Sequence, residues 1–317
     1  MPASNDAAFA GGHTPVLYQN VLSSLKLRSG GRYIDGTVGA GGHAAGILEE
    51  SAPDGELLGF DRDPAALALA RSRLQAFSGR LILQHASYAR MAEIARSLGW
   101  HTVDGILLDL GLSSMQVDQA ERGFSFLRDG PLDMRFDTTQ GQSAEELVNS
   151  FREEDLREIL WRFGDEPQAR RIAAAIVAAR PIHTTGELAT VIASVASKAR
   201  KAIHPATRSF QAIRMAVNNE LEQLEQGLEQ AVELLAPQGR IVVIAFHSLE
   251  DRLVKTTFRR ESQDCVCPPE IPVCMCGHKA RLKLITRRPI KPDEAESEGN
   301  PRSRSARLRV AEALSLA

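Results

Sequence analysis

Residues 32–45 read Arg32-Tyr-Ile-Asp-Gly-Thr-Val-Gly-Ala-Gly-Gly-His-Ala-Ala45, and this stretch decides the fold. Tyr33 and Ile34 have the character of a buried strand, the run 36–42 carries four glycines, and 43–50 has the composition of a helix. A strand, a glycine turn and a helix N-terminus form a nucleotide-type pocket, because glycines admit a close ligand and free N–H groups attract polar atoms. Residues 39–44 also fit G-x-G-x-x-A, which alone is a weak signal.

Two carboxylates beside the glycines sharpen this interpretation. Asp61 ends the next apolar run, about 20 residues past the glycines, where a carboxylate suits a ribose diol. Asp35, just before the turn, would repel the pyrophosphate of a dinucleotide. The pair therefore favours a cofactor with a cationic amino-acid end, such as S-adenosylmethionine, over a plain tight turn in an arbitrary α/β protein.

Composition limits the remaining classes. The 317 residues predict two domains, and 43% hydrophobic with 25% charged residues are typical of a soluble globular protein. We find no apolar run of transmembrane length and no secretory leader. A net charge of -2 means that any nucleic-acid binding must come from local basic patches. These features predict a cytoplasmic protein, and they leave the oligomeric state open, a homodimer included.

Short apolar strands alternate with helices through the first third of the chain, which predicts a parallel, doubly wound sheet. This alternation of strands and helices ends after residue 111 and resumes with a long helix over 217–235 and a strand over 240–246. We therefore predict a discontinuous α/β domain, residues 1–117 and 216–317, that carries an all-helical insertion, residues 118–215. Strands expected in the α/β domain include 57–61, 81–85, 105–109, 240–246, 283–285 and 305–310.

Three further polar residues are placed to act at the pocket. Asp109 ends the fourth strand, where open α/β sheets bind ligands, and either accepts N–H bonds from a substrate or cofactor amine or caps a turn. Gln116 is close enough in sequence to reach the same pocket. His247 follows the fifth strand and either assists proton removal or caps the next helix.

The insertion carries candidate RNA-binding residues. Phe124 and Phe126 either stack on unpaired bases, with Arg122, Arg128 and Arg135 on phosphates, or form the core of the insertion. Two acid-free basic runs favour nucleic acid over an ordinary solvated face. The first lies between Glu187 and Glu220 and contains Lys198, Arg200, Lys201, Arg208 and Arg214; the second lies between Glu270 and Asp293 and contains Lys279, Arg281, Lys283, Arg287, Arg288 and Lys291.

All four cysteines lie in one short stretch, as Cys265-x-Cys267 and Cys274-x-Cys276. This clustering favours reduced thiols over a disulfide framework. Because C-x-C is less typical of zinc than C-x-x-C, we expect a loop without metal, with a structural metal as the alternative.

With these residues in place, the chain resembles the bacterial 16S rRNA (cytosine-N4)-methyltransferases of the RsmH type, also called MraW. The resemblance runs from His13-Thr-Pro-Val-Leu17 to residues 300–312. It includes residues 33–43, 61–64, the stretch after Asp109, 121–126, 204–208 and 246–252, in that order.

The resemblance implies a class I S-adenosylmethionine-dependent methyltransferase, a Rossmann-like doubly wound sheet with an inserted helical domain for substrate recognition. It implies methyl transfer to N4 of a cytidine in the decoding region of 16S rRNA, in the small ribosomal subunit. The family's cofactor positions fall on Gly41, Gly42, His43, Asp61, Tyr88, Asp109 and Gln116. At residue 88 relatives often carry Phe, and the Asp/Asn-Pro-Pro-aromatic stretch of many amino-methyltransferases is replaced here by Asp109-Leu-Gly-Leu-Ser-Ser114.

Other classes make different demands on these residues. A methyltransferase for small molecules or proteins would not need two basic runs, and a dehydrogenase would need a pyrophosphate site free of Asp35. A non-catalytic RNA-binding protein would not need Asp61.

Overall fold

The computed structural model describes residues 15–196, 204–268, 270–271 and 273–315. Residues 1–12, His13 of the resemblance, and Lys198, Arg200 and Lys201 of the first basic run therefore lie outside the described residues. The chain divides into two compact units, one formed by residues 1–111 with 223–317 and the other by residues 112–222. Contacts thus place the boundaries six residues before 118 and seven after 215.

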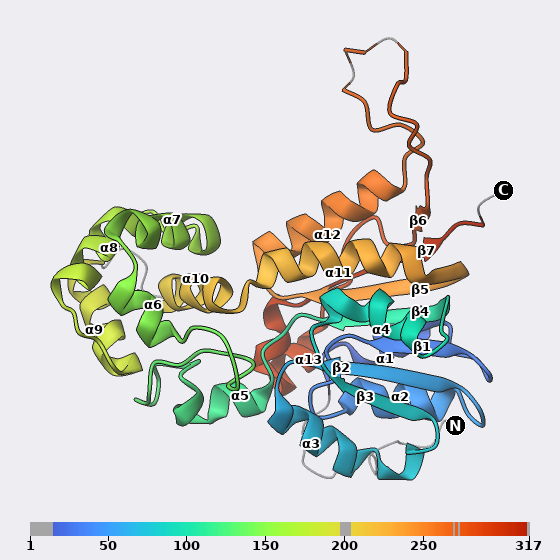
Figure 1. Ribbon diagram of the computed structural model, residues 1–317, viewed down its shortest axis with the longest axis horizontal. Coiled ribbons are helices and arrows are strands. Elements are labelled where there is room, and N and C mark those ends of the chain that lie inside the picture. The colour runs from blue at the N-terminus through green and yellow to red at the C-terminus, as the bar shows by residue number, and fades with distance from the viewer. Residues whose placement is uncertain (1–14, 197–203, 269, 272, 316–317) are drawn as a thin grey trace. The chain divides into compact units, whose positions relative to one another are not determined.

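The first unit is built on a seven-stranded sheet in the order β3-β2-β1-β4-β5-β7-β6 (Figure 1). The strands β1 to β5 are parallel, and β7 pairs antiparallel with both β5 and β6. Their bounds are β1 Arg32–Asp35, β2 Glu56–Asp61, β3 Leu81–His85, β4 Val103–Asp109, β5 Leu235–Ala245, β6 Leu282–Leu284 and β7 Arg307–Ala313. The expected doubly wound α/β fold is confirmed.

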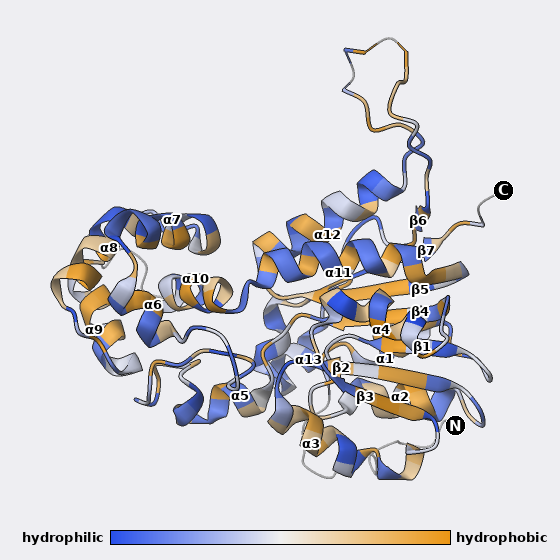
Figure 2. Cartoon of the chain, in the orientation of Figure 1, coloured by the Kyte–Doolittle hydropathy of each residue, from blue (hydrophilic) through white to orange (hydrophobic). Residues whose placement is uncertain are grey.

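Helices cover both faces of this sheet because its strands alternate apolar side chains between two cores. Ile34 belongs to one core with residues of α4 (Met91–Ser97), α11 (Glu220–Leu234) and α12 (Ser248–Glu261). Its neighbour Tyr33 belongs to the other, with α1 (Tyr18–Leu25), α2 (Gly42–Glu50) and α3 (Pro64–Arg73). Figure 2 shows the apolar strands between helices whose polar residues are blue. The short helix α13 (Glu294–Gly299) precedes β7.

A buried ion pair joins the antiparallel edge to α12. Asp251 accepts hydrogen bonds from Arg309 Nε at 2.7 Å and Arg307 Nη1 at 2.9 Å. Burial alone would raise the pKa of Asp251, but the bonds from both guanidinium groups hold it below its usual value. The stretches 246–252 and 300–312 of the resemblance are thus linked by one carboxylate that anchors β7.

Helices are the regular elements described in the second unit, which also contains a long irregular segment over residues 123–143. It contains α5 (Ser114–Asp118), α6 (Ala144–Ser150), α7 (Glu153–Gly164), α8 (Ala169–Ala178), α9 (Thr185–Val195) and α10 (Thr207–Asn218). Its only described β-type pairing is an isolated bridge between Pro131 and Thr184. The unit has a core of its own, to which α6, α7, α8, α9 and α10 all contribute.

The predicted helix over 217–235 is wrong at both ends. Residues 217–218 finish α10, and Asn219 adopts a left-handed conformation with φ 51° that separates it from α11. Asn tolerates this region better than most residues. At the far end β5 begins at Leu235 and not at residue 240, so the strand includes Pro237 and Gly239.

None of the helices among the described residues is both long and apolar enough to cross a membrane.

Candidate functional site

Three carboxyl groups end neighbouring strands at the carboxyl edge of the sheet, Asp35 buried and Asp61 and Asp109 partly buried. Asp35 ends β1 between Gly59 of β2 and Leu107 of β4 in the register. Asp61 and Asp109 each lie two residues beyond these partners, at the ends of β2 and β4. Because parallel strands end at one edge, the side chains of all three reach the same place, where open α/β sheets bind ligands.

Burial makes these carboxyl groups hard to ionise. It raises the pKa of Asp35 to about 7, and the nearby Asp109 and Asp61 raise it further against the hydrogen bond from Thr37. Burial likewise raises the pKa of Asp109 to about 7 and that of Asp61 to about 6. Only 1% of the Asp35 surface is exposed. The cluster is therefore short of positive charge, and a cationic ligand would stabilise it.

Backbone donors hold the three groups in position. Asp61 Oδ2 accepts the N–H of Gly39 at 2.8 Å, which ties β2 to the glycine turn. Thr37 donates its N–H to Asp35 Oδ1 at 3.1 Å, and its Oγ1 accepts the N–H of Asp109 at 2.7 Å. Sequence reasoning passed over Thr37, whose place between Asp35 and the glycines is its only signal.

The glycines of the turn have separate roles. Gly39 and Gly41 have φ values of 52° and 83°, in the left-handed region that favours glycine. A Cβ atom on Gly39 would meet nothing closer than 3.9 Å, whereas one on Gly42 would lie 2.6 Å from Pro15. Gly39 thus leaves open space beside Asp61. Gly42 has no room for a side chain because Pro15 packs directly against it. Gly41 precedes α2 and has no side chain to cap it, so the first N–H groups of that helix can serve a ligand.

His43 is buried and neutral. Burial lowers its pKa to about 4. Its Nε2 must carry the proton that is donated to the Val16 carbonyl oxygen at 3.1 Å, so Nδ1 has the free lone pair. Nδ1 lies 3.8 Å from Asp109 Oδ2. His43 therefore supplies no positive charge to Asp109, and its visible role is to tie the segment before α1 to the start of α2.

Tyr88 lies in a short 3₁₀ turn after β3, and its half-buried ring packs on two glycines. A Cβ atom on Gly227 of α11 would lie 2.5 Å from the Tyr88 ring, and one on Gly36 would lie 2.9 Å from Tyr88 Cβ. Tyr88 is therefore held beside the glycine turn, whose backbone donates to Asp35 and Asp61.

His247 caps α12, which is one of the two roles that its sequence position allows. Its Nδ1 accepts the N–H of Glu250 at 3.4 Å, and its Nε2 lies 2.8 Å from Glu250 Oε1. Nε2 is buried and makes no hydrogen bond to any described residue, so the cap engages only Nδ1. Glu250 is 3% exposed, and its charge contributes to the raised pKa of Asp109. Sequence reasoning missed Glu250, although its spacing from His247 is that of a capping box.

The remaining candidates belong to the second unit. Gln116, which is 6% exposed, forms a capping box with Ser113 at the start of α5. Phe124 is 9% exposed and stacks on Phe136 at 5.5 Å in the core of the unit, so it has the packing role of the two that its position allows. Phe126 is partly buried and lies 4.5 Å from the His204 ring.

The arginines of this unit differ in how much of each is already bonded. Arg214 makes two 2.8 Å hydrogen bonds to Glu220, and both side chains are largely buried. Arg122 donates to the carbonyl oxygens of residues 135 and 136, and Arg135 is paired with Asp133 at 2.7 Å. Arg208 donates once, to the Asp165 carbonyl at 3.0 Å, and Arg128 once, to the Asp118 carbonyl at 3.4 Å. Arg208 is thus better placed than Arg214 to meet a ligand.

Comparison with known proteins gives a consistent set of relatives. A sequence model described as the MraW methylase family matches residues 10–314. A protein named ribosomal RNA small subunit methyltransferase H from Thermomicrobium roseum is 56% identical, over 95% of this chain and 94% of its own. One of the same name from Citrifermentans bemidjiense is 52% identical, over 95% and 98%. Among solved structures, an rRNA methylase from Streptococcus thermophilus aligns with a TM-score of 0.41 and 9% identity, over 94% of each chain.

The raised pKa of Asp35 predicts a pH-dependent effect of Asp35→Asn. Between pH 3.8 and about 7 the folded state binds more protons than the unfolded state, so the free energy of unfolding falls as the pH rises through this window. Asparagine does not ionise, so the substitution removes this fall in the free energy of unfolding. Relative to the unsubstituted protein, Asp35→Asn should therefore gain roughly 1–3 kcal/mol between pH 5 and pH 8 in urea denaturation without cofactor. The exposed Glu158→Gln serves as the control, and a difference for Asp35→Asn that does not change with pH would contradict the assignment.

Proposed function

This chain is a member of the MraW methylase family, and we propose that it transfers a methyl group from S-adenosylmethionine to N4 of a cytidine in the decoding region of 16S rRNA. The relatives' names supply the small-subunit rRNA substrate. The observation that carries the chemistry is the cluster of Asp35, Asp61 and Asp109 around the Gly39 turn. The proposed rRNA substrate also supports a cytoplasmic location, which is part of this proposal.

The cluster suits this cofactor for reasons of charge. S-adenosylmethionine brings a sulfonium and an ammonium group, which are the positive charges that the three carboxyl groups lack. Asp61, at the end of β2, binds the ribose hydroxyls, and Asp35 faces the amino-acid end. The start of α2 lies next to the amino-acid end of the cofactor and is formed by Gly41, Gly42 and His43. The Tyr88 ring supplies a flat apolar surface for the adenine. Gln116 completes the set carried over from the family.

When bound, the cofactor supplies an electrophilic methyl carbon. The protein must orient the cytosine amine, a poor nucleophile because its lone pair is delocalised into the ring. Asp109 is the candidate acceptor for an amine N–H, since its pKa near 7 leaves it ionisable at physiological pH. His247 is the weaker candidate, because its Nδ1 already caps α12.

The helical unit and the second basic run bind the RNA in this proposal. Arg208 is partly exposed. Lys279, Lys283, Arg287, Arg288 and Lys291 are all exposed within an acid-free stretch, so they can approach phosphates. Phe126, with its partly buried ring beside His204, is a candidate for base stacking, and Arg214 and Phe124 support the RNA-binding surface by holding the unit together.

Mass mapping of ribosomal RNA tests the reaction directly. Small-subunit rRNA from cells that lack this protein should lose one methyl group from a single cytidine, and incubation with the purified protein and S-adenosylmethionine should restore it. Nuclease digestion followed by mass spectrometry would locate the methyl group on N4. A restored methyl group on carbon 5 or on the ribose would contradict the proposed acceptor.

Single substitutions should separate the two binding functions. Asp61→Ala removes a charged acceptor, so calorimetry should show a loss of about 1.5–3 kcal/mol in S-adenosylmethionine affinity with rRNA affinity unchanged.

Arg208→Ala should weaken rRNA binding and lower the slope of its salt dependence by about 1, with cofactor affinity unchanged.

Matched controls lie on the same elements. Glu56→Ala changes a partly exposed carboxylate at the other end of β2, and Arg157→Ala changes an exposed arginine of α7. Neither should alter either affinity by more than a few tenths of a kcal/mol. Loss of cofactor binding in Arg208→Ala would show that this residue supports the fold instead.

A further inference from the structure

The four cysteines lie on a loop between α12 and β6 that projects from the sheet (Figure 1). The base of the loop is closed by bonds between its two arms. Arg281 donates its N–H to the Glu261 carbonyl at 2.8 Å, and the N–H of Ala280 bonds Asp264 at 3.2 Å. The two arms therefore run side by side, and this pairing brings the two C-x-C pairs opposite each other.

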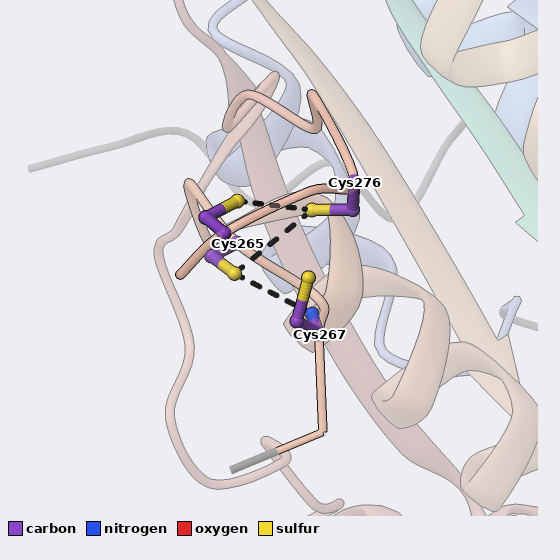
Figure 3. Close-up of side chains that lie close together, drawn as sticks. Cys265, Cys267 and Cys276 are labelled. Atoms are coloured by element: carbon purple, nitrogen blue, oxygen red, sulfur yellow. Dashed lines mark hydrogen bonds between the residues drawn. The ribbon is translucent and has the colours of Figure 1, made fainter. Parts of the chain in front are cut away.

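The four sulfur atoms form a compact cluster. All four Sγ atoms lie within 4.8 Å of one another. The sulfur atoms of Cys274 and Cys276 are 3.5 Å apart. The Cys276 sulfur lies 3.9 Å from that of Cys265 (Figure 3). In a tetrahedral zinc site with Zn–S bonds of about 2.3 Å, neighbouring sulfur atoms are about 3.8 Å apart. A disulfide would need about 2.05 Å. The spacing is that of ligands around a shared ion.

The described part of the loop has no apolar interior that would hold the sulfur atoms together. Its large apolar side chains are exposed, namely Val266 at 41%, Ile271 at 42%, Val273 at 70% and Met275 at 85%. Neither a helix nor a strand is found among the described residues between α12 and β6. A small loop without a core needs another source of stability, and bound metal is a common one.

The backbone is arranged to support thiolate ligands. The N–H of Val266 points to Cys276 Sγ at 3.5 Å, and the N–H of Cys267 points to Cys265 Sγ at 3.4 Å. Such donors are the outer-shell partners that orient metal ligands. His278 is not part of the set, because its Nε2 is bonded to the Arg260 carbonyl at 3.0 Å.

We propose that Cys265, Cys267, Cys274 and Cys276 bind one Zn²⁺ in a tetrahedral, all-thiolate structural site. Binding replaces four S–H protons, which go to solvent, with four Zn–S bonds, and no atom changes oxidation state. With four protein ligands the site has no open position, so its role is to fix the loop and not to catalyse. The expectation of a metal-free loop rested on the C-x-C spacing within each arm; pairing of the arms supplies the geometry that spacing alone does not.

The zinc site precedes the second basic run directly. Lys279 lies three residues after Cys276, and Lys283 lies on β6. A rigid loop fixes where these cations point, which is the functional consequence of the metal and the one part of this inference that rests on the proposed RNA substrate.

Metal analysis of the full-length protein tests the site. Protein purified under reducing conditions without chelator should contain about one zinc per chain. Cys276→Ser and Cys267→Ser should each lose most of it, whereas Val273→Ser, an exposed change in the same loop, should keep it. Cobalt should replace zinc and give the visible absorption of tetrahedral thiolate coordination.

Alkylation of the folded protein gives a second reading that is independent of methyltransferase activity. The thiols should react slowly until a chelator is added, and then all four should react. The proposal would be overturned if protein purified without chelator contained no zinc and all four of its thiols alkylated freely. Paired disulfides that account for all four sulfur atoms under reducing conditions would also overturn it. Loss of zinc from Val273→Ser equal to that from Cys276→Ser would also overturn it.

Discussion

The structure depends on three buried or partly buried carboxyl groups at one edge of a parallel sheet. Burying an ionisable acid without a counter-ion is costly, and here burial raises the pKa values of Asp35 and Asp109 to about 7. Repulsion adds to this effect, from Asp109 and Asp61 on Asp35 and from Glu250 on Asp109. Nearby His43 gives no relief, because its own burial lowers its pKa to about 4. A site of this kind is unfavourable by itself and becomes favourable when a cation enters, which is why its electrostatics indicate a positively charged cofactor before any relative is considered.

Much of the fold could be predicted from local sequence. The strand over 81–85 was predicted with its observed bounds and the one over 57–61 to within one residue, because short apolar runs between turn residues have few alternatives. The break at Asn219 could not be predicted, since one left-handed residue leaves the apolar spacing almost unchanged. The length of β5 could not be predicted either, because the strand contains Pro237 and Gly239 and its extent is set by pairing with β4. The family membership that the motifs indicated is confirmed.

Less of the candidate site than of the fold could be predicted from the sequence, for a physical reason. Strand-end aspartates are visible in sequence because their positions follow from the period of the sheet. The roles of Thr37 and Glu250 arise from hydrogen bonds that require the folded geometry. Arg214 has the same composition signal as Arg208, and only the contact with Glu220 distinguishes them. The C-x-C spacing of the cysteines predicted a loop without metal, whereas the paired arms of the loop support a zinc site.

With pKa values of about 7, Asp35 and Asp109 are partly protonated near neutral pH when the site is empty, and we expect them to ionise when a cation enters. Calorimetric titration with S-adenosylmethionine near pH 6.5, in buffers of different ionisation enthalpy, measures the protons exchanged on binding. Because a bound cation lowers the pKa of a nearby carboxyl group, we expect net proton release that diminishes above pH 8, where Asp35 and Asp109 are already ionised. Adenosine, which lacks the charged end, should release fewer protons. Binding of S-adenosylmethionine with no buffer dependence at pH 6.5 would contradict the account.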